Sequence, residues 1–270
     1  MSLPSRRRPT ILITGASAGI GAALARVYAA EGWDLILTAR RTGPLEALAE
    51  EVARLGAVYT VIADDLADPE APRRLFDAVE TRGLQVDGLI NNAGFSRTAG
   101  FLSTDPAEHA AMIHVMLAAP TELSRLFAPG MVERGFGRIL NVASLAGQMP
   151  ATGGDTLYGP IKSFLIKASQ GLHLELAGTG VHVTALCPGY TLTEFHDANG
   201  TRAEVSSAYP GWMWMSAERV ARVGYAACEK NRAKVTPGAM NVLLATLGKH
   251  LPDGLALAMV GGHARRLKRL

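Results

Sequence analysis

Cysteine is nearly missing from this sequence, and long apolar runs are missing altogether. The 270 residues contain only Cys187 and Cys228, which lie far apart in apolar stretches. No disulfide framework is therefore expected, and both thiols should lie in the core of a protein from a reducing cytoplasm. No apolar run reaches the roughly 18 residues that a membrane span needs, and SRRRP at 5–9 leads into a short strand without a signal-like apolar region. Together, the few cysteines and the short apolar runs predict a soluble cytoplasmic protein. HExxH and CxxC spacings do not occur either, so no metal site is expected.

Charge is also sparse, and it is unevenly placed. Charged residues make up 19% of the chain and hydrophobic residues 48%, and the net charge is +3. Basic residues form runs at both ends, at 6–8 and in HARRLKRL at 263–270. These runs can be solvated ends or can touch phosphates or lipid headgroups; so mild a net charge favours solvated ends, and no nucleic-acid partner is expected. We divide the chain into a frayed basic N-terminus (1–9), one large domain (10–250) and an apolar and basic tail (251–270).

What the sequence does contain is a regular alternation of short β-branched runs with longer helical patterns. The alternation continues without a linker or an internal repeat, which predicts a single doubly wound α/β domain whose parallel sheet is covered by helices on both faces. The only long irregular stretch is 190–216, where a lid over a site is expected. The expected strands are 10–14, 34–39, 57–63, 86–93, 137–144, 181–188 and 233–237, and the expected helices are 19–32, one that ends near 56, 69–83, 105–134 and 156–178.

A glycine-rich turn follows the first strand. TGASAGIG at 14–21 places Gly15, Gly19 and Gly21 between a strand and a helix. Glycines allow a tight turn and close backbone approach, and the amino end of the helix offers free N–H groups and a positive dipole end to a pyrophosphate. The turn, with Ser17 and Ile20, therefore predicts a dinucleotide site, although an ordinary glycine turn has the same pattern.

The end of the second strand indicates which dinucleotide binds. An acidic residue there would bind the 2'-hydroxyl of the adenosine ribose, but LTARRT has Arg40 and Arg41 instead. Two guanidinium groups suit a 2'-phosphate, and no carboxylate is present to repel it. NADP(H) is predicted in preference to NAD(H); the alternative is that the arginines only begin a solvated helix.

Six motifs in order resemble those of the short-chain dehydrogenase/reductase family. They are TGASAGIG at 14–21, DLAD at 65–68, NNAG at 91–94, Ser144 in NVASLAG, Tyr158 with Lys162, and PGYTLT at 188–193. The resemblance covers nearly the whole chain and implies a Rossmann-type fold with a seven-stranded parallel sheet, NAD(P)(H) dependence and chemistry at an alcohol or carbonyl carbon. The flanks look like the single-domain NADP-preferring reductases of broad substrate range. For these, a homodimer or homotetramer through the helices at 105–134 and 156–178 is expected.

The resemblance also assigns residues to the cofactor. One group would lie beside the adenine and its ribose, and a second group at the nicotinamide end. The first group is Asp65, Leu66, Asn92, Ala93 and Gly94, and the second is Pro188, Gly189, Thr191 and Thr193, together with Tyr158 and Lys162.

Ser144, Tyr158 and Lys162 are the predicted catalytic residues. Hydride transfer needs a proton donor or acceptor at the substrate oxygen, and a free phenol with a pKa near ~10 is a poor base at neutral pH. Lys162, together with the positive charge of oxidised nicotinamide, would lower the pKa of Tyr158, whereas burial alone would raise it. The hydroxyl of Ser144 can hydrogen-bond the substrate oxygen.

Gly159 and Pro160 stand between the tyrosine and the lysine, although they are the poorest helix formers. If the helix begins near Asp155 or Thr156, Pro160 falls in the first turn or just past it, where a missing N–H costs little. We predict that start, which keeps the two side chains one helical turn apart on the same face.

Met116 in HVMLAAP departs from the family pattern. The family usually has an asparagine there, which feeds a proton relay through water to the lysine, and a thioether cannot donate a hydrogen bond. We expect a rerouted relay and slow turnover; the alternative is a nucleotide-binding sensor or scaffold with weak or lost catalysis. His114 is not expected to substitute for the asparagine, because it lies on another face of the helix. His196 and Asp197 are expected to be solvated loop residues.

Large apolar side chains gather late in the irregular stretch. AYPGWMWMS at 208–216 contains Tyr209, Trp212, Met213, Trp214 and Met215. They predict either a cover over an apolar ligand or a packing surface. The leading prediction for the whole chain is an NADP(H)-dependent enzyme that interconverts a carbonyl and a secondary alcohol on a fairly hydrophobic substrate.

Overall fold

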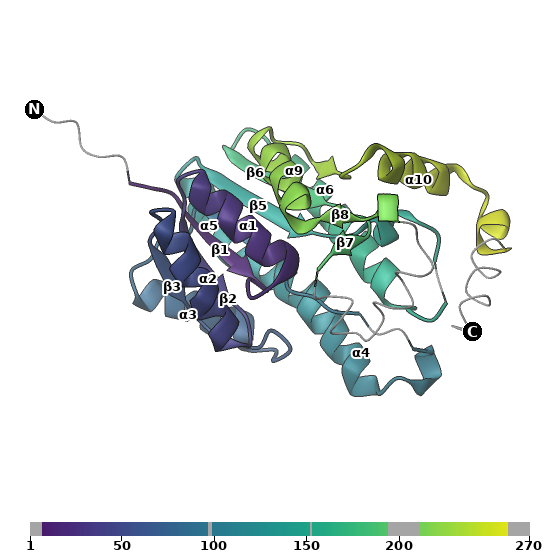
Figure 1. Ribbon diagram of the computed structural model, residues 1–270, viewed down its shortest axis with the longest axis horizontal. Coiled ribbons are helices and arrows are strands. Elements are labelled where there is room, and N and C mark those ends of the chain that lie inside the picture. The colour runs from purple at the N-terminus through teal and green to yellow at the C-terminus, as the bar shows by residue number, and fades with distance from the viewer. Residues whose placement is uncertain (1–6, 97–98, 152, 194–210, 259–270) are drawn as a thin grey trace, which may run out of the picture.

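The computed structural model describes residues 7–96, 99–151, 153–193 and 211–258 of the chain. Its centre is a seven-stranded parallel sheet in the order β3-β2-β1-β4-β5-β6-β9 (Figure 1). All seven predicted strands are present, each within the range that the sequence indicated. They are β1 (Thr10–Thr14), β2 (Asp34–Thr38), β3 (Tyr59–Val61), β4 (Gly88–Asn91), β5 (Gly137–Val142), β6 (Val181–Leu186) and β9 (Lys234–Val235).

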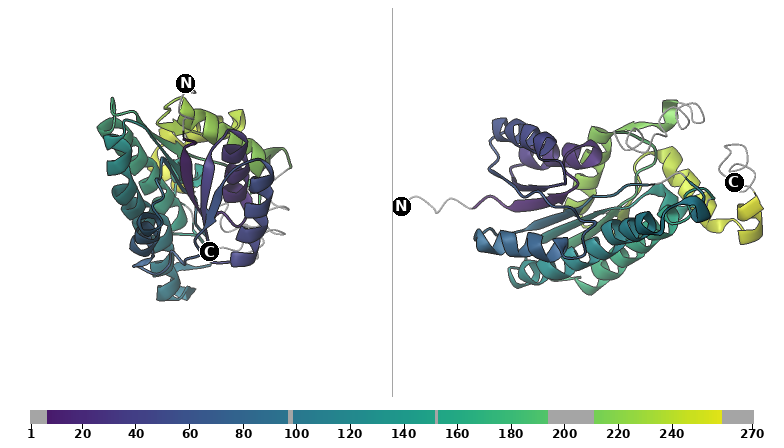
Figure 2. Two further views of the ribbon diagram at one scale, coloured as in Figure 1. Left: turned by 90° about the vertical axis from the view of Figure 1, so that its left-hand side faces the viewer. Right: turned by 90° about the horizontal axis from the view of Figure 1, so that it is seen from below.

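Helices cover both faces of the sheet (Figure 2). In β1, Ile11 and Ile13 belong to one core cluster, and Leu12 between them belongs to the other. This follows from the geometry of a strand, in which successive side chains point to opposite faces. With both faces buried, the strands are almost entirely apolar. One face is covered by α1 (Gly19–Ala30), α2 (Thr42–Arg54) and α9 (Ala217–Glu229), and the other by α3 (Ala71–Thr81), α5 (Ala119–Glu133) and α6 (Tyr158–Glu175).

The strand order reverses beside β1. From β1 the chain runs outward through β2 and β3, and then returns to β4 on the other side of β1. Doubly wound sheets bind ligands outside the carboxyl ends of their strands at such a point. Because β1 leads directly into TGASAGIG and β4 into NNAG, these two motifs lie together at the expected binding crevice.

The helix predicted at 105–134 is interrupted. α4 (Pro106–Ile113) leads into a π-helical turn at His114–Ala118, and α5 begins only at Ala119. The continuous apolar pattern gave no sign of this turn. π turns are frequent at functional sites, and this one contains Met116.

The chain after β6 contains elements that the sequence pattern did not reveal. β7 (Thr191–Leu192) and β8 (Met215–Ser216) pair in parallel and join the two ends of the predicted lid. Residues 194–210, with His196, Asp197 and Tyr209, lie outside the described residues, as does the side chain of Trp212. α10 (Ala239–His250) follows β9 and extends past the sheet (Figure 1). Across the described ranges, no helix combines the length and the apolar character needed to cross a membrane.

Candidate active site

The turn after β1 needs glycine at three positions. Gly15 and Gly19 have φ angles of +64° and +56°, in the left-handed region that favours glycine. Gly21 is required by packing instead: a Cβ there would lie 2.3 Å from the carbonyl oxygen of Gly15 and 2.5 Å from Nδ2 of Asn92. The glycine turn is therefore pressed against NNAG.

The amino end of α1 lacks a side-chain cap. The N-cap residue Ala18 makes no side-chain hydrogen bond, and the first turn carries no acidic residue. Its N–H groups and the positive end of the helix dipole therefore suit an anion. Ser17 and Ile20 lie on either side of this helix start, where they were predicted to contribute.

Thr14 ties the glycine turn to NNAG. Its Oγ1 accepts hydrogen bonds from the backbone N–H groups of Asn92 (2.9 Å) and Ala93 (3.1 Å) and donates to the carbonyl oxygen of Ile90 (3.2 Å). In return, Nδ2 of Asn92 donates to the carbonyl oxygens of Thr14 and Gly15, both at 3.0 Å. The sequence analysis missed Thr14; its signal was a β-branched polar residue at the end of a buried strand, directly before the glycine.

Arg40 lies beside the residues predicted for the adenine. Its guanidinium is 4.0 Å from the carboxylate of Asp65, and both side chains are more than half exposed. An ion pair this exposed contributes little to stability, so Arg40 can turn toward a phosphate at small cost. Arg41 is the N-cap residue of α2, and Leu66, next to Asp65, is buried. The arginine pair and Asp65 thus lie in one region.

Ser144, Tyr158 and Lys162 meet where β5 ends and α6 begins. The Ser144 hydroxyl accepts a hydrogen bond from the N–H of Ala146 at 3.1 Å and also hydrogen-bonds the Tyr158 phenol. Lys162 is 4% exposed, and its Nζ donates to the carbonyl oxygen of Val142 at 2.9 Å. The same Nζ lies 5.6 Å from the centroid of the Tyr158 ring. The three predicted catalytic side chains therefore form one cluster.

Burial dominates the acid–base properties of this cluster. It raises the pKa of Tyr158 to about 12, an effect that the hydrogen bond with Ser144 partly opposes. Burial also lowers the pKa of Lys162 from 10.5 to about 8. Among the protein groups, desolvation of the phenolate is the largest effect on Tyr158, in the direction expected for burial alone; the lowering predicted with oxidised nicotinamide bound stays a prediction. The protein groups by themselves keep the phenol protonated at neutral pH.

α6 begins at Tyr158, two to three residues later than predicted. Its first backbone bond runs from the N–H of Ile161 to the carbonyl oxygen of Leu157 at 3.0 Å. Pro160 is therefore the third residue of the helix, where an N–H would have no intrahelical acceptor. With this later start, Pro160 still lies in the first turn, where a missing N–H costs little. Tyr158 and Lys162 keep their i, i+4 relation.

Comparison with known proteins decides the family. A protein-family model described as short chain dehydrogenase matches residues 9–204. The chain belongs to the short-chain dehydrogenase family. It is 35% identical over 217 residues to sulfoacetaldehyde reductase 2 of Chromohalobacter salexigens, a match that covers 79% of this chain and 85% of that protein. It is also 35% identical over 224 residues to serine 3-dehydrogenase of Agrobacterium fabrum, with 80% and 86% covered.

Solved structures of short-chain dehydrogenases share the fold over nearly the whole chain. A short-chain dehydrogenase from Sphingobium yanoikuyae, in complex with NADPH, has a TM-score of 0.77 and 29% identity, with 96% of this chain and 95% of that chain covered. L-sorbose reductase from Gluconobacter frateurii, complexed with NADPH and L-sorbose, has a TM-score of 0.74 and 25% identity, with 86% and 96% covered. The predicted single Rossmann-type domain and the oxidoreductase class, acting on CH–OH or C=O groups, are confirmed.

In this short-chain dehydrogenase, the segment after β6 returns to the glycine turn. A Cβ on Gly19 would lie 3.1 Å from the side chain of Thr193. The carbonyl oxygen of Pro188 accepts a hydrogen bond from the N–H of Leu145 at 2.8 Å, and Thr191 Oγ1 donates to the carbonyl oxygen of Gly189 at 3.0 Å. The residues predicted for the nicotinamide end therefore lie between the glycine turn and the segment that begins with Ser144.

α10 adds a buried residue to this region that the sequence analysis missed. Asn241 Nδ2 donates to the carbonyl oxygen of Pro237 at 2.8 Å, and a Cβ on Gly189 would lie 2.6 Å from the same atom. The available signal was a single amide in the otherwise apolar run AMNVLLATL.

Met116 occupies the space next to Lys162. Its side chain is buried within the π turn. A Cβ on Gly94 would lie 3.0 Å from the Met116 sulfur and 3.7 Å from Nζ of Lys162. The thioether is thus in the neighbourhood where the family's asparagine would act on the lysine.

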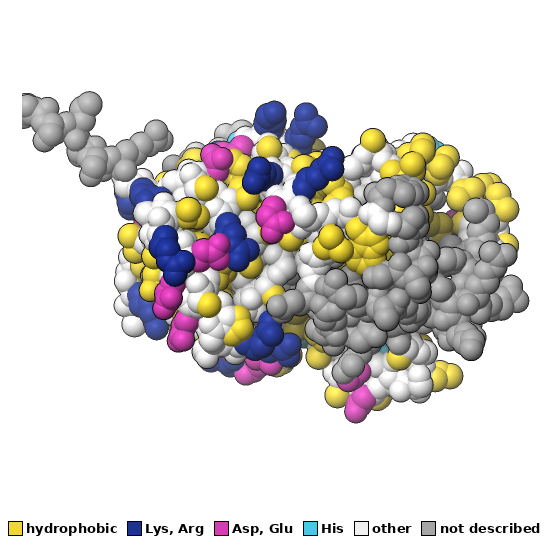
Figure 3. All heavy atoms as spheres, in the orientation of Figure 1, with side chains coloured by type: hydrophobic (Ala, Val, Ile, Leu, Met, Phe, Trp, Pro, Cys, Tyr) yellow, Lys and Arg dark blue, Asp and Glu magenta, His cyan; other side chains and the backbone are white. Residues whose placement is uncertain are grey.

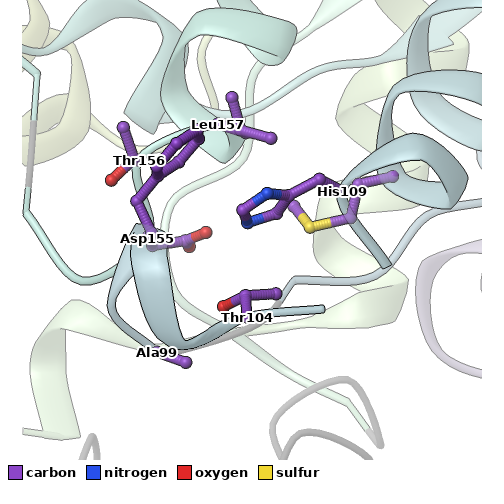
Figure 4. A pocket seen from close by; sticks show the side chains of 8 residues that line it. Ala99, Thr104, His109, Asp155, Thr156 and Leu157 are labelled. Atoms are coloured by element: carbon purple, nitrogen blue, oxygen red, sulfur yellow. The ribbon is translucent and has the colours of Figure 1, made fainter. Parts of the chain in front are cut away.

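A small hollow lies beside the start of α6 (Figure 4). His109 of α4 and Asp155 point toward each other across it, and Thr104 and Leu157 also line it. The ring of His109 stacks on that of Phe101, with 4.7 Å between centroids. The sequence analysis did not assign a role to these residues. Because Leu157 immediately precedes Tyr158, the hollow adjoins the predicted catalytic residues.

Proposed function

We propose that this chain is an NADP(H)-dependent oxidoreductase that interconverts a carbonyl and a secondary alcohol on a fairly hydrophobic substrate. The observation that carries the proposal is the cluster of Ser144, Tyr158 and the buried Lys162 at the carboxyl end of β5. Carboxyl ends of strands at a switch point are where doubly wound sheets perform chemistry.

The donor groups around the glycine turn fit NADP(H). The uncapped start of α1 suits the pyrophosphate, and Arg40 and Arg41 suit the 2'-phosphate. The two solved relatives named above are both described as complexes with NADPH, which supports the same choice here. When bound, the nicotinamide supplies or accepts the hydride.

The catalytic cluster provides the proton. In the reductive direction, Tyr158 donates its phenolic proton to the carbonyl oxygen, and the hydroxyl of Ser144 hydrogen-bonds the same oxygen. A pKa of about 12 keeps that proton on Tyr158 until the oxygen becomes basic. Lys162, held by Val142, then places its ammonium where it stabilises the tyrosinate. In the oxidative direction the same groups act in reverse.

Aromatic groups near the ends of the 190–216 stretch support an apolar substrate. Tyr190 and Trp214 lie with their ring centroids 5.4 Å apart, and Met215 is buried beside them in β8. The named relatives have names that refer to small polar molecules, sulfoacetaldehyde, serine and L-sorbose. This chain therefore differs from them in the substrate class that we propose.

The test is a panel of ketones and aldehydes followed by NADPH absorbance. The wild-type chain should reduce some of them, and Tyr158→Phe should lower kcat by at least ~10²-fold while NADPH affinity, measured by fluorescence titration, stays within about threefold. Tyr59→Phe, at an exposed position of β3, is the matched control and should leave kcat unchanged. NADPH binding without turnover on any compound would instead favour a nucleotide-binding sensor.

A further inference from the structure

A single arginine of α3 fastens the turn that follows β3. Nε and Nη2 of Arg74 donate to the two carboxylate oxygens of Asp64 at 3.2 and 2.7 Å, and its Nη1 donates to the carboxylate of Asp68 at 2.7 Å. These two aspartates stand at the two ends of residues 64–68, which include DLAD and which we call the DLAD turn. One guanidinium group therefore joins both ends of the turn to α3.

The contact of Arg74 differs from the simpler charge pairs around it. In Figure 3, basic and acidic side chains lie side by side over the half of the molecule where Figure 1 places α2 and α3. The neighbouring Arg73, for example, pairs with Asp77 one helical turn away, and because both side chains are more than half exposed this pair contributes little. Arg74 instead makes a bidentate contact with Asp64, whose side chain is only 16% exposed, and reaches a second carboxylate as well. A bidentate contact within a network holds a defined geometry.

The two carboxylates that Arg74 holds are also bonded to the backbone of the turn. Asp64 accepts a hydrogen bond from the N–H of Asp65 at 2.8 Å, and Asp68 accepts one from the N–H of Glu70 at 3.0 Å. Within the turn, the N–H of Asp68 donates to the carbonyl oxygen of Asp65 at 3.0 Å. The N–H of Glu70 contributes most to lowering the pKa of Asp68, and Arg74 contributes next. The position of the guanidinium is thereby passed to the backbone of the turn.

We propose that Arg74 is a positioning residue for the adenine half of NADP(H), because it fixes the turn that carries Asp65 and Leu66. This inference rests on the proposed function, in which these two residues receive the adenine. A turn that is already fixed loses little conformational freedom when the cofactor binds, and such preorganisation increases affinity. The chemical step takes place at the other end of the cofactor. Loss of Arg74 should therefore weaken binding of the cofactor and leave kcat unchanged.

The competing role for Arg74 is direct contact with the 2'-phosphate. All three nitrogen atoms of its guanidinium already donate to carboxylates, and these carboxylates would repel a phosphate beside them. Arg40, which is 69% exposed and 4.0 Å from Asp65, is better placed to turn toward that group. The two roles differ in a measurable way, because the adenine is common to NADPH and NADH whereas the 2'-phosphate is present only in NADPH.

Calorimetric titration of the full-length chain with NADPH, NADH and 2',5'-ADP tests the proposal. Arg74→Met removes the guanidinium, and Arg74→Lys keeps the charge but cannot make the bidentate contact. Arg73→Met removes an exposed ion pair from the same helix and is the matched control. Thermal unfolding of each variant verifies that the domain is intact, and Asp64→Asn weakens the same contact from the other side if Arg74→Met is unstable. The kcat at saturating NADPH is measured on a ketone or aldehyde that the wild type reduces.

We expect Arg74→Met to bind all three ligands at least about fivefold more weakly, by similar factors, with kcat within about twofold of the wild type. Arg74→Lys should regain less than about half of the lost affinity, and Arg73→Met should bind like the wild type. Unchanged affinities in Arg74→Met would overturn this inference and leave the proposed function standing, whereas a wild type that binds no nucleotide would overturn both. Weaker binding of NADPH and 2',5'-ADP with unchanged NADH would make Arg74 a ligand of the 2'-phosphate instead. If no compound is reduced, the three affinities still decide.

Discussion

Replacing Lys162 with methionine should stabilise the folded protein while abolishing the activity that we propose. The lysine is 4% exposed, and burial lowers its pKa from 10.5 to about 8. A difference of that size corresponds to about 3 kcal/mol of unfavourable free energy when the amine is charged in the native state. Methionine has a similar length and no charge, so the variant avoids this cost.

The gain is reduced by one lost hydrogen bond. Nζ of Lys162 donates to the carbonyl oxygen of Val142 at 2.9 Å, and such a bond contributes about 1 kcal/mol. We therefore expect Lys162→Met to raise the free energy of unfolding by about 2 kcal/mol at pH 7. An active-site lysine kept at this cost to stability would be consistent with a catalytic role.

The sign of the pH dependence follows from proton binding. Between the native pKa of about 8 and the ordinary value of 10.5, the unfolded chain holds a proton on Lys162 that the native chain has released. The free energy of unfolding of the wild type therefore rises with pH in this window relative to the variant. The advantage of the variant should be largest below pH 8 and should shrink toward pH 10. The buried thiols of Cys187 and Cys228 also have raised pKa values and contribute to the pH dependence of the wild type, so the two proteins are compared at each pH.

Urea unfolding of both proteins across this pH range measures that difference. Lys167→Met, at an exposed position of the same helix, is the control and should change the free energy of unfolding by less than about 0.5 kcal/mol. A variant that is less stable than the wild type at pH 7, or a stability difference that stays constant from pH 7 to pH 10, would refute the reasoning.

Three further substitutions test other parts of the site. Arg40→Asp should lower kcat/KM for NADPH at least about tenfold relative to NADH, since a carboxylate repels a 2'-phosphate; an unchanged ratio would place the 2'-phosphate elsewhere. Gly21→Ala would bring a Cβ within 2.3 Å of the Gly15 oxygen and should distort the glycine turn. Calorimetry should therefore show at least about tenfold weaker NADPH binding. The control Gly43→Ala has open space around the added Cβ and should bind NADPH like the wild type. Met116→Asn should raise kcat and alter its pH profile, and identical rates and profiles would refute the rerouted relay.

The sheet could be predicted because burial of a strand on both faces leaves a simple sequence pattern. Strands such as ILIT and LILT are buried on both faces, so they appear as apolar runs that no surface residue interrupts. The glycine turn could be predicted equally well, since a positive φ and a close backbone approach leave glycine as the only suitable residue. Ser144, Tyr158 and Lys162 were found through their order and spacing, and the fold brings them together as expected.

The missed features depend on contacts between distant segments. The π turn at 114–118 contains no glycine or proline, so its sequence looks like continuous helix. The raised pKa of Tyr158 could not be read from spacing, because it is set by how completely the neighbouring elements exclude water. The pairing of β7 with β8 and the contact of Asn241 with Gly189 link residues that are more than 20 positions apart.

The contact between Asn241 and Gly189 ties the C-terminal helix to the centre of the domain. Asn241 fills the space beside a residue predicted for the nicotinamide end, and its Nδ2 also donates to the carbonyl oxygen of Pro237. A change in the position of α10 would therefore shift Gly189, so the orientation of this helix and the shape of the predicted nicotinamide site should change together.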